Sequence, residues 1–344
     1  MKPSRVRIVD VAKAAGVSAA TVSMVLNNKG SISASTRQHV LAVADELGYI
    51  HEGSNKDTAA QMLALVVEEL PVPLFADPFC SEIMAGVEEE ARRLGFGMLL
   101  VVLPTIKGET VIPNNLRGRN LAGIIGLGGG DLADSTVQEI VALGHPVVLV
   151  DNHLPEPSAF GTVSSIVADN FRAGYLATQH LLRLGKRRLA IIQGSRKYKP
   201  LNERFYGFLA AMMDYGVKPE DQYICQKISR GATKGQAEAE YLLSLSNPPE
   251  GIICISDKVA LNVLGPVMRL GLQVPQNIGI LGIDDIYGAS QTDPPLTTVR
   301  IPKREMGRVA VRQLLRCIDT GQEYYTKTCL PVELVIRGSC GART

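Results

Sequence analysis

Hydroxyl side chains near the N-terminus have the chemistry and the spacing to contact a polyanion. They are Ser18, Thr21, Ser23, Ser33 and Thr36. A hydroxyl at or near the start of a helix can donate a hydrogen bond to a phosphate oxygen, and the helix N-terminus itself favours anions. The first 40 residues also contain six Lys and Arg side chains but a single acidic residue, Asp10. Both features favour binding to a nucleic acid.

Charged side chains that could bind a small polar ligand lie at the ends of apolar runs in the rest of the chain. Asp151 follows the run 147–150, and Asp284 follows the run 278–283. Carboxylates accept hydrogen bonds from sugar hydroxyls, while the guanidinium of Arg204 can donate to hydroxyl, carboxylate or phosphate groups. A helix cap or a surface salt bridge is the alternative role for each of these residues.

Three short helices are expected to position the N-terminal hydroxyls. Residues 8–15 have a helical apolar pattern that ends at Gly16, because glycine tolerates a positive φ. Ser18 is a favourable N-cap for a second helix over 19–26, and Ser33 is one for a third helix that runs to residue 47. Two short helices joined by a glycine-containing turn, with a third beneath them, predict a helix-turn-helix domain.

The second helix is the candidate for reading base edges. Its first residues are small, so the helix can enter the major groove deeply. The candidate DNA-binding residues are Ser18, Ala19, Ala20, Thr21, Ser23, Met24, Asn27, Ser33 and Thr36. A three-helix interaction module that binds no DNA remains open on the pattern alone.

Apolar runs alternate with helical patterns over residues 62–344. The predicted strands are 63–67, 98–103, 123–127, 146–150, 163–168, 189–193, 251–255 and 278–283. The predicted helices are 82–94, 135–143, 171–184, 203–215, 235–245 and 258–270. Short, continuously apolar strands that alternate with helices indicate parallel sheets covered on both faces. Because this segment is too long for one core, we expect two α/β lobes with ligands beyond the carboxyl ends of their strands.

The composition is that of a globular protein, with 46% hydrophobic and 20% charged residues and a net charge of +2. The N-terminus MKPSR is polar, and no apolar run reaches the length of about 18 residues that a membrane span needs. None of the six cysteines forms a CxxC pair or joins a cluster with zinc-ligand spacing. We therefore expect a cytoplasmic protein with reduced, mostly buried thiols and no bound metal.

No arrangement of residues is typical of a catalytic centre. The sequence contains no GxSxG motif, and its five histidines are scattered. The glycine run 126–130 lacks GxGxxG spacing, which disfavours a dinucleotide site. We expect neither an enzyme nor a cofactor. A soluble small-molecule binding protein without DNA function is the alternative to a DNA-binding regulator.

Several strings in the sequence match known signatures. In the N-terminal part they are VDVAKAAGVSAATVS over 9–23, VLN over 25–27, SxxTR over 33–37 and LGY over 47–49. In the body they are LGHPVVLVD over 143–151, ADN over 168–170, HLLRLG over 180–185, RxxGF over 204–208, VP at 274–275, GIDD over 282–285 and PLTTV over 295–299. Together these strings resemble the lac-repressor family of transcriptional regulators over nearly the whole chain.

The resemblance implies a helix-turn-helix domain over 1–50, a linker over 51–61 and an effector-binding and dimerisation domain over 62–344. The last is expected to have the two-lobed α/β fold of periplasmic sugar-binding proteins, with three crossovers. The resemblance places 62–164 and 292–325 in the first lobe, and 165–291 and 326–344 in the second.

The resemblance also implies a homodimeric repressor that binds a pseudo-palindromic operator and responds to a small effector held between the lobes. A sugar is the commonest effector of the family. A nucleoside or an acidic metabolite remains open, because the chain contains no Trp, a residue that often stacks on sugars.

The matched positions favour an effector-binding role for Asp151, Arg204 and Asp284. Ser256 occupies a position where the family often has Asn, and Phe79 stands in a motif where an aromatic ring could stack on the ligand. The candidate effector-binding residues are Phe79, Asp151, Arg204, Ser256 and Asp284. We interpret the neighbouring Asp257 and Asp285 as helix caps or structural partners.

The sequence departs from the family pattern at two places. Met24 stands where the family usually has an arginine that can read guanine, so we expect an operator without that guanine. The linker 51–61 lacks the Pro-Asn and Ala-Arg-x-Leu pattern of the family's hinge helix. We favour the absence of a hinge helix of the usual kind, with Met62 as a poor alternative to the leucine that wedges into the minor groove.

Overall fold

The structure is a computed structural model of the chain. It describes residues 8–26, 32–47, 62–70, 73–106, 109–113, 116, 121–128, 132–152, 163–195, 198–226, 233–321 and 326–342. The chain divides into two units, residues 1–61 and 62–344. Asn27 and the linker 51–61, with its expected lack of a hinge helix, lie outside the described residues.

The described part of the N-terminal unit contains three helices, as predicted. They are α1 (Ile8–Ala14), α2 (Ala19–Leu26) and α3 (Ala34–Glu46). Each helix contributes a fully buried valine to one small apolar core: Val11, Val22 and Val40. Gly16 turns the chain between α1 and α2 with a φ of 64°. The two helices meet at 102°, which is the geometry of a helix-turn-helix.

Within the described residues, no single helix is both long enough and apolar enough to cross a membrane. Ile8–Ala14 and Ala19–Val25 reach that length and composition only when they are taken together, across the 102° bend.

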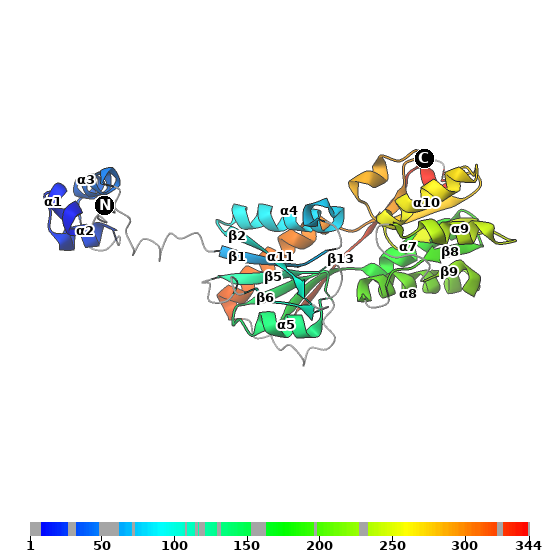
Figure 1. The fold of residues 1–344 in the computed structure, drawn as a ribbon, viewed down its shortest axis with the longest axis horizontal. Coiled ribbons are helices and arrows are strands. Elements are labelled where there is room, and N and C mark those ends of the chain that lie inside the picture. The colour runs from blue at the N-terminus through cyan, green and yellow to red at the C-terminus, as the bar shows by residue number, and fades with distance from the viewer. Residues whose placement is uncertain are drawn as a thin grey trace. The chain divides into compact units, whose positions relative to one another are not determined.

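The first lobe of the body is built on a six-stranded parallel sheet (Figure 1). Its order is β13 (Lys327–Leu330), β7 (Ser164–Ala168), β6 (Val147–Val150), β5 (Gly123–Leu127), β1 (Met62–Glu68) and β2 (Gly97–Leu103). The helices α4 (Pro78–Arg93) and α11 (Lys303–Thr320) pack together on one face, and α5 (Asp134–Val141) covers the other. A short hairpin of β3 (Thr105–Ile106) and β4 (Glu109–Thr110) follows β2. Apolar residues fill β1 and β5, as expected for strands buried on both faces.

The second lobe repeats this design. Its sheet has the order β14 (Glu333–Val335), β12 (Thr297–Arg300), β11 (Gly279–Asp284), β10 (Gly251–Cys254), β8 (Leu189–Ile192) and β9 (Ile224–Cys225). All neighbours are parallel except β12 and β14. The helices α7 (Asn170–Arg183) and α8 (Lys199–Asp214) pack as one pair, and α9 (Gln236–Ser244) and α10 (Asp257–Arg269) as another. The 3-10 turns η1 (Leu74–Ala76), η2 (Asp221–Tyr223), η4 (Tyr287–Ser290) and η5 (Gly338–Cys340) complete the described elements.

The chain crosses between the two sheets three times, after β7, β12 and β13. The expected crossovers, at 164/165, 291/292 and 325/326, are therefore wrong by about one strand each. Residues 165–168 and 327–330 belong to the first sheet, and residues 297–300 belong to the second. A strand joins the sheet whose edge completes its backbone hydrogen bonds, as Thr297 does opposite Leu281. The pattern of the strand itself does not contain that information.

Glycines allow the helices of each lobe to approach closely. On α4, a Cβ at Gly86 would lie 1.9 Å from the carbonyl oxygen of Arg304 on α11. On α7, a Cβ at Gly174 would lie 1.8 Å from the carbonyl oxygen of Arg204 on α8. The same kind of contact therefore fixes the main helix pair in both lobes, and in the second lobe it fixes the backbone of Arg204.

The cysteines are free, as predicted. Cys329 is exposed, and the other five are buried: Cys80, Cys225, Cys254, Cys317 and Cys340.

Candidate DNA-binding and effector sites

Hydroxyl side chains cap the two helices that follow the turns of the N-terminal unit. The Ser18 Oγ atom accepts a hydrogen bond from the Thr21 backbone N–H at 3.0 Å and lies 2.8 Å from the Thr21 hydroxyl. The Ser33 Oγ atom does the same for Thr36, at 3.1 Å and 2.7 Å. These serines stabilise the starts of α2 and α3, where the backbone N–H groups favour a phosphate.

The outward face of α2 is short and apolar. Ala20 and Met24 are exposed one turn apart, while Val22 and Val25 are buried on the opposite side. Ala19, Thr21 and Ser23 are half-buried beside them. Met24 is 40% exposed. The predicted DNA-binding residues that are described thus lie at the start of α2 and on its free face, and at the start of α3.

Arg204 is the centre of a buried polar cluster in the second lobe. Its side chain is 4% exposed, and its Nη1 atom lies 3.0 Å from Asp284 Oδ1. The Arg204 Nε atom donates to Asn170 Oδ1 at 2.8 Å, and Nη1 donates to the Ile255 carbonyl at 2.7 Å. The contact with Asp284 is an ion pair without the geometry of a hydrogen bond, since no hydrogen bond reaches Oδ1 from the described residues.

Asp284 ends β11 in an unusual backbone conformation. Its φ is 128°, a value that side-chain-bearing residues seldom adopt. The Lys303 ammonium, 2% exposed, donates to the carbonyl oxygens of Asp284 and Asp285. Burial raises the pKa of the Asp284 carboxyl, and the positive charges of Arg204 and Lys303 oppose the rise. The strained strand end is therefore held by a lysine from the first turn of α11.

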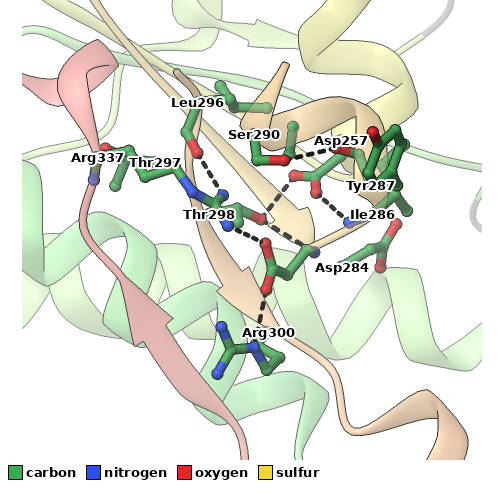
Figure 2. A network of polar contacts seen from close by, with 12 residues as sticks. Asp257, Asp284, Ile286, Tyr287, Ser290, Leu296, Thr297, Thr298, Arg300 and Arg337 are labelled. Atoms are coloured by element: carbon green, nitrogen blue, oxygen red, sulfur yellow. Dashed lines mark hydrogen bonds and ion pairs between the residues drawn. The ribbon is translucent and has the colours of Figure 1, made fainter. Parts of the chain in front are cut away.

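Asp257 and Asp285 act as structural partners, in agreement with their expected role. Asp257 accepts hydrogen bonds from the Thr298 hydroxyl at 2.6 Å and from the Ile286 backbone N–H at 3.0 Å (Figure 2). Burial, together with the nearby charge of Asp284, raises its pKa to about 7. Asp285 binds two arginines of the same lobe, Arg300 at 2.8 Å and Arg337 at 2.6 Å. Burial alone would raise the pKa of Asp285, but these hydrogen bonds hold it below its usual range.

Asp77 connects the first lobe to the second. Its Oδ1 atom caps α4 by accepting hydrogen bonds from the backbone N–H groups of Phe79 and Cys80, both at 3.0 Å. Its Oδ2 atom lies 2.7 Å from the Lys258 ammonium, on the first turn of α10. The ring of Phe79 is half-buried beside this junction. The start of α4 and the start of α10 therefore meet across the lobes.

Asp151 lies on the same side of the first lobe as Asp77. Asp151 is 7% exposed, follows β6 directly and has a φ of 54°. Burial raises the pKa of the Cys80 thiol, and the negative charges of Asp77 and Asp151 raise it further. Both carboxylates are therefore near this thiol. Next in sequence, Asn152 is 2% exposed, and its Nδ2 atom meets no hydrogen-bond acceptor among the described residues. A buried donor of this kind is costly unless a ligand or water completes it.

Ser256 is the N-cap of α10. Its hydroxyl accepts a hydrogen bond from the Val259 backbone N–H at 3.4 Å, and the side chain is half-buried. The cap is the structural role that was the alternative for this residue. Within the described ranges, no group of three or more His, Cys, Asp or Glu side chains is arranged to hold a metal ion.

Comparison with known proteins decides which family these features belong to. Residues 7–52 match the description of bacterial regulatory proteins of the lacI family, and residues 178–340 match a periplasmic binding protein-like domain. The transcriptional regulator DegA of Bacillus subtilis is 34% identical over 338 residues, which cover 96% of this chain and 97% of DegA. The chain belongs to the lacI family.

The transcriptional repressor CytR of Escherichia coli K12 is 32% identical to this lacI-family chain over 339 residues, 97% of this chain and 96% of CytR. Among solved structures, the CelR–cellobiose complex has 28% identity and a TM-score of 0.72, with 97% of this chain and 100% of CelR covered. The lac repressor dimer bound to operator and the anti-inducer ONPF has 24% identity and a TM-score of 0.79 over 98% of this chain and 100% of that one. The predicted fold, a helix-turn-helix domain with a two-lobed α/β domain, is confirmed. This chain is a transcriptional regulator of the lacI family that binds DNA through its N-terminal unit.

Several residues of the lacI-family body were missed from the sequence. Arg204 and Asp284 are brought together as expected, but Asn170, Asp77, Lys258 and Lys303 complete the polar cluster. Asp77 and Asn170 carried a signal, since each lies at the start of a helix behind a buried strand. A lysine on the first turn of a helix carries none, because most such lysines are solvated.

Proposed function

We propose that this protein is a ligand-responsive repressor that binds a pseudo-palindromic operator as a homodimer. The observation that carries the DNA part is the helix α2, which is capped by the Ser18 hydroxyl and exposes Ala20 and Met24 on its free face. One such helix from each subunit would occupy one major groove, so that twofold symmetry of the dimer is mirrored in the DNA. The protein acts by binding and not by catalysis.

We propose that the effector binds between the lobes, at Phe79, Asp151, Arg204, Ser256 and Asp284. Asp151 and Ser256 lie just after β6 and β10, and Asp284 ends β11. Phe79 and Arg204 lie on α4 and α8, the next α-helices after β1 and β8. Ligands of open α/β sheets bind beyond such strand ends. The Asn152 amide, which has no acceptor among the described residues, is an additional donor for an oxygen of the effector. Ser256 would contribute through the side of its hydroxyl that does not cap α10.

The charges of the cluster favour a neutral effector. Three cations of the described body lie there, and each already has a partner. Arg204 is paired with Asp284, Lys258 is paired with Asp77, and Lys303 is bound to backbone carbonyls. An anionic effector would have to displace one of these partners, while a neutral sugar or nucleoside can use carboxylate acceptors and the Asn152 donor. CelR, 28% identical over nearly the whole chain, was solved with cellobiose, which has this chemistry.

A matched pair of substitutions tests the DNA part. Ala20 on α2 and Ala42 on α3 are both exposed. Ala20→Glu places a negative charge on the face that is proposed to enter the groove, and we expect it to abolish binding to the DNA upstream of the protein's own gene. Ala42→Glu adds the same charge outside α2 and should weaken binding only a few-fold, about the effect of one phosphate contact. Equal effects of both substitutions in a fluorescence-anisotropy titration would exclude α2 as the reading helix.

A thermal-shift screen tests the effector part. The panel contains cellobiose and other neutral sugars, nucleosides and small dicarboxylic acids. A ligand that binds the folded state raises the melting temperature, by an amount set by its concentration relative to its Kd. We expect hits among neutral compounds and their loss in Asp151→Ala. A screen in which only the acids stabilise the protein would contradict the charge argument.

A further inference from the structure

The two carboxylate oxygens of Asp77 have separate partners. Oδ1 serves its own lobe, because it accepts the two backbone hydrogen bonds that cap α4. Oδ2 serves the other lobe, because it binds the ammonium of Lys258 at 2.7 Å. The Asp77 side chain is 8% exposed, and that of Lys258 is 50% exposed. The cap fixes Asp77 in place, so the lysine meets a carboxylate that is already oriented.

This ion pair joins elements that the chain does not connect directly. Asp77 precedes α4 of the first lobe, and Lys258 lies on α10 of the second, 181 residues further along the chain. Lys303 also reaches the second lobe, but it does so right beside the crossover that follows β12. If the lobes move as a hinge about the crossovers, a contact far from the crossovers resists that motion. A contact beside a crossover moves little and resists it less.

The charge of the Lys258 ammonium acts on groups of both lobes. Its charge lowers the pKa of the Cys80 thiol on α4 and that of the Asp284 carboxyl at the end of β11, where burial raises both. Two of the proposed effector-binding residues are close to the ion pair in sequence. Phe79 lies two positions after Asp77, and Ser256 lies two positions before Lys258.

We propose that Lys258 is a positioning residue for the effector, and that its ion pair with Asp77 is a latch that holds the two halves of the effector site at binding distance. The lysine acts through Asp77 and not by touching the effector. This inference rests on the proposed effector site between the lobes. The latch itself is testable without an effector, so that its failure is distinguishable from a failure of effector binding.

The Cys80 thiol is a native probe of the latch. It is 2% exposed and lies between the charges of Asp77, Asp151 and Lys258. Alkylation by iodoacetamide, read for each cysteine by peptide mass spectrometry, reports how often the thiol meets solvent. Cys329 is exposed and supplies the reference rate in the same sample.

Two variants break the latch without removing the cap. Asp77→Asn retains an oxygen that can accept the backbone hydrogen bonds of α4, and Lys258→Gln does not touch α4. Arg269→Gln is the matched control, because Arg269 is paired at 2.7 Å with Glu240 inside the second lobe. Lys258→Arg is the conservative variant, which keeps the charge.

Lys258→Gln distinguishes a loss of charge from an opening of the latch, because the two predict opposite changes in the rate of Cys80 alkylation. Removing the lysine charge alone raises the pKa of the Cys80 thiol and slows its alkylation, since the thiolate is the reactive form. Opening of the latch exposes the thiol and speeds its alkylation. We expect Lys258→Gln to speed Cys80 alkylation about threefold to tenfold relative to Cys329. Lys258→Arg and Arg269→Gln should leave the rate near that of the wild type.

Asp77→Asn should also speed the reaction, and added salt should speed it in the wild type more than in Lys258→Gln. The proposal is overturned if folded Lys258→Gln, verified by its thermal unfolding, alkylates at Cys80 as slowly as the wild type or more slowly. It is equally overturned if Arg269→Gln speeds the reaction as much, because the effect would then come from general loosening. Once a ligand is found in the thermal-shift screen, Lys258→Gln should weaken its binding, and Lys258→Arg should restore it.

Discussion

The guanidinium of Arg204 lies 3.0 Å from the carboxylate of Asp284, and each side chain is only 4% exposed. Removing one partner of a buried pair leaves the other charge without compensation, at a cost of about 3–5 kcal/mol. We therefore expect Arg204→Met to lower the free energy of unfolding by about that amount and to abolish effector binding. Urea unfolding of residues 1–344 at constant pH measures the first effect.

Arg300→Gln is the control for this variant. Arg300 also binds an aspartate, Asp285, but its side chain is 47% exposed. Exposed ion pairs contribute about 1 kcal/mol or less. If Arg204→Met and Arg300→Gln cost the same, the Arg204–Asp284 pair is not the anchor of the site.

Asp257 makes the stability of the body depend on pH. Its pKa is about 7 in the folded protein and 3.8 as the ordinary value, because burial and the charge of Asp284 disfavour the carboxylate. The folded state then binds more protons than the unfolded state between pH 4 and 7. Stability must fall as the pH rises through this window, by on the order of 4 kcal/mol for this group alone.

Asp257→Asn should remove this dependence. An asparagine can still accept from the Ile286 N–H and can donate to the Thr298 hydroxyl, which itself accepts from the Asp285 N–H. Urea unfolding at pH 5 and pH 8 compares the two proteins. We expect the wild type to lose stability from pH 5 to pH 8 and the variant to lose much less. A wild type that gains stability over this range relative to the variant would contradict the assignment.

Gly86 allows α4 and α11 to cross. In an ordinary helix, Gly→Ala stabilises by about 0.5–1 kcal/mol. Here the new methyl group would meet the Arg304 carbonyl oxygen at 1.9 Å, so the helices would have to separate. We expect Gly86→Ala to destabilise the body by about 1–3 kcal/mol, the usual cost of overpacking. The sign of the change in the free energy of unfolding, measured with urea, therefore tests the close crossing of α4 and α11.

Met24 is predicted to face one base position of the operator. Its side chain is 40% exposed on the free face of α2 and cannot make two hydrogen bonds to guanine. Met24→Arg should add a preference for guanine at that position worth about 1–3 kcal/mol. Selection of binding sites from random DNA, performed on both proteins, measures this. A wild-type site that strongly requires a guanine opposite Met24 would refute the interpretation.

Local patterns in the sequence predicted most of the individual elements. The predicted helices 82–94 and 203–215 begin four residues later than α4 and α8, whose first turns contain Pro78 and Pro200. A proline in the first turn costs no hydrogen bond, since the first N–H groups of a helix have no partner. Helix α11 was overlooked, although Met306, Ala310 and Leu314 have the spacing of one buried face.

The site was only partly predictable, for a different reason. Asp284 and Arg204 could be proposed from their positions, but their mutual pairing depends on Asn170 and on the glycine contact that fixes the Arg204 backbone. The choice of sheet for β12 and the contact between Asp77 and Lys258 are long-range events. No pattern within a single segment specifies them.

The central claim, that ligand binding in the body controls DNA binding by the N-terminal unit, has one direct test. The operator affinity of the full chain is measured by fluorescence anisotropy at fixed salt, with and without a saturating ligand from the thermal-shift screen, beside a scrambled duplex. A typical coupling of about 1–3 kcal/mol predicts a change of about 5-fold to 150-fold for the operator and much less for the scrambled DNA. An operator affinity that is unchanged by saturating ligand, or that equals the affinity for scrambled DNA, would contradict the account.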